Sequence, residues 1–66
     1  MKNNIKVERA INGFTQEDLA NKVSVSRQTI NAMEANKYIP STVLSMKIAK
    51  IFNKRVEDLF FLEDSD

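Results

Sequence analysis

The stretch Arg27–Ala35 combines residue types that recognise other molecules by hydrogen bonding. Its apolar residues Ile30 and Met33 indicate a helix with one inner side. The opposite side is narrow and uncharged and consists of Gln28, Asn31, Ala32 and Ala35. Each amide there carries a donor and an acceptor, which suits bidentate hydrogen bonding to N6 and N7 of adenine, and the alanines allow a close approach. A purely solvated helix face would more commonly carry Glu and Lys, so we interpret this one as a recognition surface.

Arg27 stands at the first position of this helix, where its guanidinium can extend towards guanine O6 and N7 or towards a phosphate. A second short helix precedes it. Thr15, followed by Asp18 three positions on, predicts the N-cap of that helix, and Ser26 predicts the N-cap of the helix that Arg27 begins. Two short helices joined by about three residues are typical of a helix-turn-helix, here over residues 15–35.

Helical spacing continues along the rest of the chain, so we predict an all-α domain with five helical segments. The first covers about residues 4–12, ends at Gly13, and has an apolar stripe of Val7, Ala10, Ile11 and Phe14. The last elements are a fourth helix over 41–53, a fifth turn over 56–60 and a tail over 61–66. The expected inner positions of the second, third and fourth helices are Leu19, Ala20, Val23, Ile30, Met33, Leu44, Ile48, Ile51 and Phe52.

The composition excludes most other classes of function. A chain of 66 residues has room for one small domain, which we expect to span residues 1–66. It has no Cys and no His, so we predict no metal, no cofactor and no enzymatic activity. Neighbouring acids, as at Glu17–Asp18 and Glu57–Asp58, do not face each other on a helix and fit helix starts. No apolar run is long enough to cross a bilayer, and the start of the chain resembles no secretion signal, so a cytoplasmic protein is expected.

The net charge is +1, but residues 1–62 carry ten basic and six acidic groups, a net of +4, ahead of an acidic tail. Such a balance permits a polyanionic partner without requiring one.

Three separated segments resemble, in the same order, the Cro and phage-repressor helix-turn-helix family, also called the xenobiotic-response-element type. They are residues 13–20 (GFTQEDLA), 23–30 (VSVSRQTI) and 33–37 (MEANK). The resemblance covers residues 5–60 and is closest to minimal members, such as the cytolysin repressor, that consist of this domain alone and act as homodimers. It implies a five-helix, lambda-repressor-like domain that binds operator DNA and regulates transcription, as a repressor.

By position, the resemblance implies two sets of DNA contacts. The residues that would meet base edges are Arg27, Gln28, Asn31 and Thr29. The residues that would contact the backbone are Gln16, Ser26, Asn36, Lys37 and Tyr38. Backbone contacts position a domain, whereas base contacts select the sequence. The resemblance also pairs Arg9 with Glu34, an acid that lies beside the apolar side of its helix and needs a partner there.

The sequence departs from the family pattern at two turns. Ser24 and Asn36 stand where glycines are common, so we expect left-handed backbone there, strained at Ser24 because its Cβ crowds the chain. Lys54 and Arg55 replace an apolar residue and a small capping residue, which predicts a less firmly seated fifth turn.

The end of the chain predicts self-association. Consecutive residues point in different directions, so a domain this small can turn only some of the last apolar residues to its own core. We therefore expect a two-fold homodimer whose interface is formed by Leu59, Phe60, Phe61 and Leu62. Residues 1–4 and the tail are short enough to pair as edge strands in that interface. Such a dimer would match a palindromic operator.

The alternative function is a protein-interaction module, such as an antitoxin or a subunit of a larger regulator. An exposed apolar patch that self-association leaves unexplained would favour it. RNA is a less favoured ligand because its deep, narrow groove does not admit a helix. Binding to a mixed pool of duplex DNA, single-stranded DNA and RNA would separate these functions.

Overall fold

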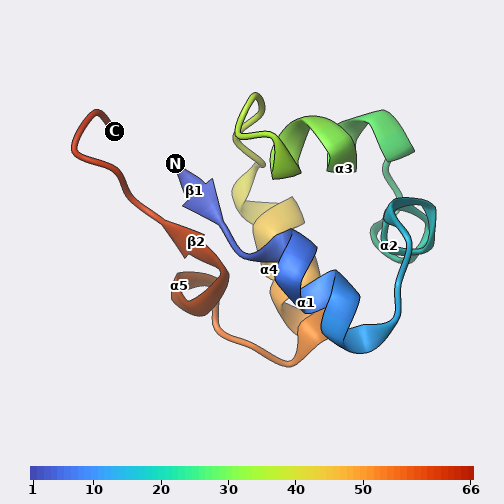
Figure 1. Ribbon diagram of the computed structural model, residues 1–66. Helices are drawn as coiled ribbons and strands as arrows, with labels where there is room; N and C mark the ends of the chain where they lie inside the picture. The colour runs from blue at the N-terminus through green and yellow to red at the C-terminus, as the bar shows by residue number, and fades with distance from the viewer.

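The computed structural model describes residues 1–66 and contains five helices and a two-stranded sheet, in agreement with the predicted all-α class. In chain order the elements are β1 (Lys2–Asn3), α1 (Ile5–Asn12), α2 (Gln16–Val23), α3 (Arg27–Glu34), α4 (Thr42–Phe52), α5 (Val56–Leu59) and β2 (Phe60–Phe61). In Figure 1, α2 and α3 lie on one side of α1 and α4, and α5 and the sheet lie on the other. No helix is long and apolar enough to span a membrane.

The two strands come from opposite ends of the chain and pair antiparallel, with Lys2 opposite Phe61 and Asn3 opposite Phe60. The sheet therefore forms within one chain, whereas the sequence placed these strands in an interface between chains. The Met1 ammonium lies 3.1 Å from Asp66 Oδ1 and 3.3 Å from Glu63 Oε1. These contacts, led by the hydrogen bond to Asp66, raise the pKa of the Met1 amine.

Polar caps begin the helices that form the helix-turn-helix. Thr15 Oγ1 accepts a 3.0 Å hydrogen bond from the Asp18 amide, and Asp18 Oδ2 accepts a 2.9 Å bond from the Thr15 amide. Together they form a capping box at the start of α2. Ser26 Oγ accepts a 3.2 Å bond from the Thr29 amide and caps α3 in the same way. The sequence predicted both starts because capping depends on residues close together in the chain.

Left-handed residues end three of the helices. Gly13 ends α1 with φ 70°, Ser24 ends α2 with φ 60° and Asn53 ends α4 with φ 53°. Asn36, after α3, also has φ 60°. The left-handed turns expected at Ser24 and Asn36 are thus present. Asn tolerates this conformation better than Ser does, so the strain is greatest at Ser24.

The core is a single cluster of twelve apolar residues at the centre of the helices. Its fully buried members are Ile5, Leu19, Ile30, Met33, Ile48 and Leu59. The predicted inner positions of α2, α3 and α4 are buried with one exception, Ile51, which is exposed. The fifth turn is firmly held despite Arg55 at its start. Asp58 Oδ2 accepts a 3.3 Å hydrogen bond from the Arg55 amide, and Leu59 is fully buried.

The apolar stripe predicted for the first helix is wrong except at Phe14, which is half-buried and packs against the core. Val7 and Ile11 remain 54% and 70% exposed, and Ile5 is the residue of α1 that enters the core. Arg9, one turn after Ile5, lies on the same side of the helix. Because its guanidinium binds the Phe14 carbonyl in the loop after α1 and the Glu34 carboxylate of α3, a charged residue occupies the inward position that the sequence assigned to apolar ones.

Candidate nucleic-acid interface

The outer side of α3 carries the side chains that the sequence assigned to base recognition. Arg27, Gln28 and Asn31 are exposed and together line an open hollow of about 420 Å³ that contains no apolar side chain. Arg27 is the first residue of α3, next to its Ser26 cap, so its charge stands at the end of the helix. This surface offers one cation and two amides to an incoming ligand.

Thr29 is placed differently from these three residues. It is half-buried, and its Oγ1 lies 3.0 Å from Ser26 Oγ, so its hydroxyl is already engaged in a hydrogen bond within the chain. Ser26 itself accepts the Thr29 amide as a cap. A base contact by Thr29 and a DNA-backbone contact by Ser26 stay predictions. Each would use a hydroxyl group that already takes part in the cap of α3.

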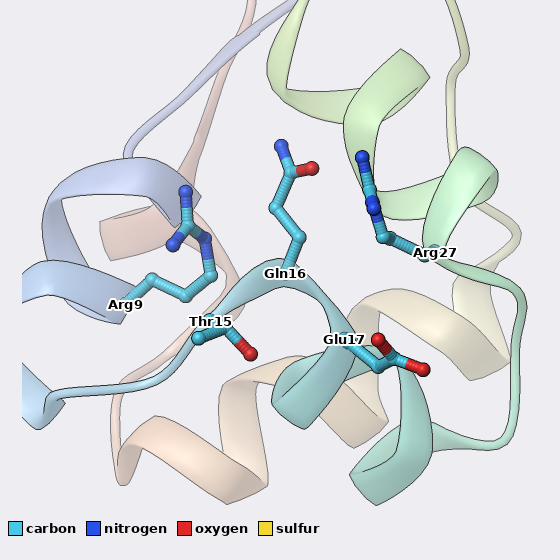
Figure 2. Close-up of a pocket in the computed structure, with 5 residues that line it drawn as sticks. All are labelled: Arg9, Thr15, Gln16, Glu17 and Arg27. Carbon is cyan, nitrogen blue, oxygen red and sulfur yellow. The ribbon is translucent and has the colours of Figure 1, made fainter.

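A second hollow, of about 340 Å³, lies between α1, the start of α2 and the start of α3. Its lining residues are Arg9, Thr15, Gln16, Glu17 and Arg27. Figure 2 shows that Arg9, Gln16 and Arg27 extend to the same side of the start of α2, whereas the Glu17 carboxylate points away from Gln16. Side chains from three helices thus line one hollow beside the recognition surface, and the donors of Arg9 and Gln16 there already bind Glu34.

Arg9 and Glu34 form the ion pair that joins α1 to the end of α3. Arg9 Nε lies 2.7 Å from Glu34 Oε2, and Nη2 lies 3.0 Å from Oε1. Nη1 also donates to the Phe14 carbonyl at 2.9 Å. The side chains are 15% and 7% exposed, respectively, so the pair is largely removed from water. The hydrogen bond to Glu34 raises the pKa of Arg9.

Glu34 is also linked to the outer side of α3. Gln16 Nε2 donates a 3.2 Å hydrogen bond to Glu34 Oε1, and Asn31 Nδ2 donates a 3.4 Å bond to Gln16 Oε1. Gln16, assigned to the DNA backbone by resemblance, therefore also contacts a residue assigned to base recognition. The sequence did not predict these two bonds because they depend on how α2 crosses α3.

The loop after α3 holds the remaining residues assigned to the DNA backbone. Asn36 adopts the left-handed conformation that turns the chain, and its Oδ1 accepts a 3.4 Å hydrogen bond from Asn3 Nδ2. The Lys37 amide donates to the Ala32 carbonyl at 2.9 Å. The side chains of Lys37 and Tyr38 are exposed on this fixed loop and are free to meet a phosphate.

The residues assigned to a dimer interface divide into two groups. Leu59 is 0% exposed and Phe60 is buried as well, so both belong to the core, and their assignment to an interface is wrong. The reason is the sheet, because pairing of β2 with β1 turns Phe60 inward. Phe61 and Leu62 are exposed and remain available.

Sequence reasoning missed a further apolar surface beside this tail. Ile39, Met46 and Val56 are exposed and line a hollow of about 240 Å³, together with the edge of Phe60. The signal was present in α4, whose sequence TVLSMKIAKIF is apolar on almost all sides. A helix of this kind is normally covered on more than one face.

The fold and the site define a class of protein. Two short capped helices cross through a tight turn, and the second presents an arginine and two amides on its outer side, as in a helix-turn-helix DNA-binding domain. The helix-turn-helix family model matches residues 5–59. The chain therefore belongs to the Cro and phage-repressor type of the helix-turn-helix family.

Relatives in several organisms are similar to this chain over its whole length. A protein of Methanocaldococcus jannaschii is 54% identical and one of Bacillus subtilis, YgzD, is 46% identical, each over all of both chains. A protein of Archaeoglobus fulgidus is 50% identical over all of this chain and 94% of its own. All three bear the name uncharacterized HTH-type transcriptional regulator.

Proposed function

We propose that this protein is a sequence-specific transcriptional regulator that binds duplex DNA with α3 in the major groove. The observation that carries the proposal is the outer side of α3, where Arg27, Gln28 and Asn31 stand exposed around one polar hollow. An arginine reads guanine and amides read adenine through paired hydrogen bonds. The names of the similar proteins from M. jannaschii and B. subtilis support the same function.

Phosphate contacts from the neighbouring elements would hold α3 in the groove. Gln16, at the start of α2, lies beside Asn31, and Lys37 and Tyr38 are exposed in the loop after α3. Such contacts fix the orientation of a domain on DNA but carry no sequence information. Ser26 and Asn36 would contribute through the backbone that they position.

Selection from a random-sequence duplex library tests this function directly. We expect the parent chain to enrich one motif, and Gln28→Ala to lose about 1–3 kcal/mol of discrimination at one base pair. Lys22→Ala is the control and should leave the motif unchanged, because Lys22 lies over the Phe14 ring and outside the set assigned to DNA. Failure of the parent to enrich any motif, or a Gln28→Ala motif identical to that of the parent, would contradict the proposal.

We also infer that the regulator acts as a two-fold homodimer on a palindromic operator. The supporting observations are the exposed side chains of Ile39, Met46 and Val56, which line one hollow with Phe60, and the exposed side chains of Phe61 and Leu62, which follow Phe60 in the chain. A second copy would cover these side chains, since the hollow there accepts a protruding side chain such as Leu62. The domain measures 31 × 23 × 21 Å, so paired copies suit half-sites one DNA turn apart, roughly 34–36 Å.

Met46→Glu tests the dimer, because it places a charge in the proposed interface while Met46 is exposed in the single chain. We expect a folded monomer with much weaker operator binding, measured by sedimentation equilibrium and by titration of labelled duplex. Lys47→Glu is the control, since Lys47 lies about 100° further round α4. A parent chain that is monomeric at high micromolar concentration, or a Met46→Glu variant that is still dimeric, would rule this interface out.

We propose repression as the mode of regulation, because a bound dimer occupies promoter DNA that a polymerase needs. The similar proteins come from archaea and a bacterium, whose DNA lies in the cytoplasm, and we place this protein there. A reporter gene placed behind the selected operator tests whether the protein represses or activates transcription. Expression that falls when the protein is supplied supports repression, and expression that rises identifies an activator.

A further inference from the structure

A chain of three hydrogen bonds connects the buried ion pair to the recognition surface. Arg9 Nη2 donates to Glu34 Oε1 at 3.0 Å, Gln16 Nε2 donates to the same oxygen at 3.2 Å, and Asn31 Nδ2 donates to Gln16 Oε1 at 3.4 Å. The chain begins on a side chain that is largely removed from water and ends on an exposed one. It is a physical path from the interior to the outer side of α3.

The chemistry of the first acceptor fixes the direction of every bond in this chain. A carboxylate only accepts, so Gln16 must turn its NH₂ group towards Glu34. The oxygen of the Gln16 amide then faces the other way, towards α3. An oxygen only accepts, so Asn31 must turn its own NH₂ group towards Gln16. The negative charge of Glu34 thus determines the orientation of two amides in succession.

The orientation of Asn31 determines what it offers to a base. With one N–H bound to Gln16, Asn31 keeps its Oδ1 and its second N–H free. The proposed mechanism requires the bound N–H to be the one trans to Oδ1, so that the two free groups form one edge of the planar amide. Adenine presents an N6 donor and an N7 acceptor in the major groove, which match that edge. An amide turned by half a rotation would present the two groups in the reverse order.

We propose that Glu34 and Gln16 are positioning residues that set the base specificity of Asn31, so that adenine is selected at the base pair facing it. The inference rests on the proposed function, since it requires α3 to read DNA. Gln28 offers a contrast within the same helix. Its amide makes no hydrogen bond within the chain, so the proposed mechanism acts on Asn31 and leaves Gln28 unaffected.

The experiment compares base preferences, not affinities. Asn31→Ala first identifies the base pair that Asn31 reads, as the position at which the selected motif loses its preference. Gln16→Met then removes the middle link while keeping the length of the side chain and leaving the ion pair of Arg9 and Glu34 in place. Preference at each position is measured by competition between duplexes that differ in one base pair.

We expect Gln16→Met to reduce the preference for adenine at the Asn31 position to about twofold, from the roughly five- to hundredfold typical of a bidentate amide contact. The preference at the Gln28 position should remain as in the parent. In the Asn31→Ala background, Gln16→Met should produce no further change in preference. A Gln16→Met variant that binds every duplex more weakly by the same factor, with the adenine preference intact, would overturn the proposal and leave Gln16 as a phosphate contact only.

Gln16→Lys tests the direction of the bonds. A lysine has donors and no acceptor, so it can bind Glu34 and then requires the oxygen of Asn31, which turns the NH₂ group of Asn31 outwards. We expect the preference to move from adenine towards guanine, whose O6 and N7 both accept. Retention of the adenine preference would overturn the proposal. If the parent itself selected no motif, the proposed function would have failed. If the parent selected a motif but the Gln16 variants kept its adenine preference, only the positioning mechanism would have failed.

Discussion

Replacement of Arg9 by Met should destabilise the domain strongly, because it leaves the Glu34 carboxylate without its cationic partner. That carboxylate is 7% exposed and accepts two bonds from Arg9, at 2.7 and 3.0 Å, against one from the neutral amide of Gln16. Breaking a buried pair from one side costs about 3–5 kcal/mol. Arg9 retains 15% exposure, so we take the lower end, about 3 kcal/mol.

In a domain of this size, about 1 kcal/mol shifts the melting temperature by roughly 4–8 °C, so we expect Arg9→Met to melt roughly 12–24 °C below the parent. Thermal and urea unfolding followed by circular dichroism measure the change. Arg55→Met is the matched control. Its partner Asp58 lies 3.2 Å away, but both side chains are exposed, so the fall in melting temperature should be much smaller.

Two results would refute this reasoning. One is an Arg9→Met variant that melts within about 3 °C of the parent, which would correspond to less than about 1 kcal/mol. The other is a fall in melting temperature for Arg9→Met that is no larger than the fall for Arg55→Met. The double variant Arg9→Met, Glu34→Leu should recover most of the stability, because apolar residues can replace a buried ion pair at little cost. A double variant as unstable as Arg9→Met would show that the unpaired carboxylate is not the cause.

Three further predictions concern single positions. Ser24→Gly should raise the free energy of unfolding by about 0.5–1 kcal/mol, since glycine adopts φ 60° without a Cβ clash, and a lower melting temperature would contradict this. Lys37→Ala should weaken binding to all duplexes alike and reduce the salt slope by roughly one, so an unchanged slope would exclude a phosphate contact. The hydrogen bond from the Thr15 amide lowers the pKa of Asp18 below its ordinary 3.8. Its stabilisation is therefore present above about pH 4 and is lost as the pH falls through the lowered pKa, so Asp18→Asn should melt with a weaker dependence on pH in acid.

Features set by neighbouring residues in the chain could be predicted from the sequence. Thr15 and Ser26 cap the helices they precede, and Gly13 and Ser24 end helices in the left-handed conformation. In each case the physical cause lies within a few residues, in a side chain that reaches a nearby amide or in a Cβ that crowds its own backbone. The tertiary fold leaves such local preferences intact.

Features that depend on contacts between distant elements were predicted less well. Apolar residues on one side of α1 indicated a buried stripe, but Val7 and Ile11 are exposed because Arg9 turns inward to Glu34, 25 positions away in the chain. The sequence predicted Phe60 to be part of an exposed apolar run, but its pairing with Asn3, near the other end of the chain, buries it. Periodicity identifies which side of a helix is apolar, but the partner element decides which side is covered.

The same long-range contacts explain how so small a domain holds its recognition helix in place. Only Ile30 and Met33 anchor α3 in the core, and a helix held by two residues on one side can rock about them. The last turn of α3 is therefore bound by polar contacts from two other elements. Glu34 holds the last turn to α1 through Arg9, and Asn3 Nδ2 donates a 2.8 Å hydrogen bond to the Met33 carbonyl. Asn3 also pairs with Phe60 of β2, so the two-stranded sheet and the end of α3 form one hydrogen-bonded unit. This unit joins the tail beside the proposed dimer surface to the helix that is proposed to read DNA.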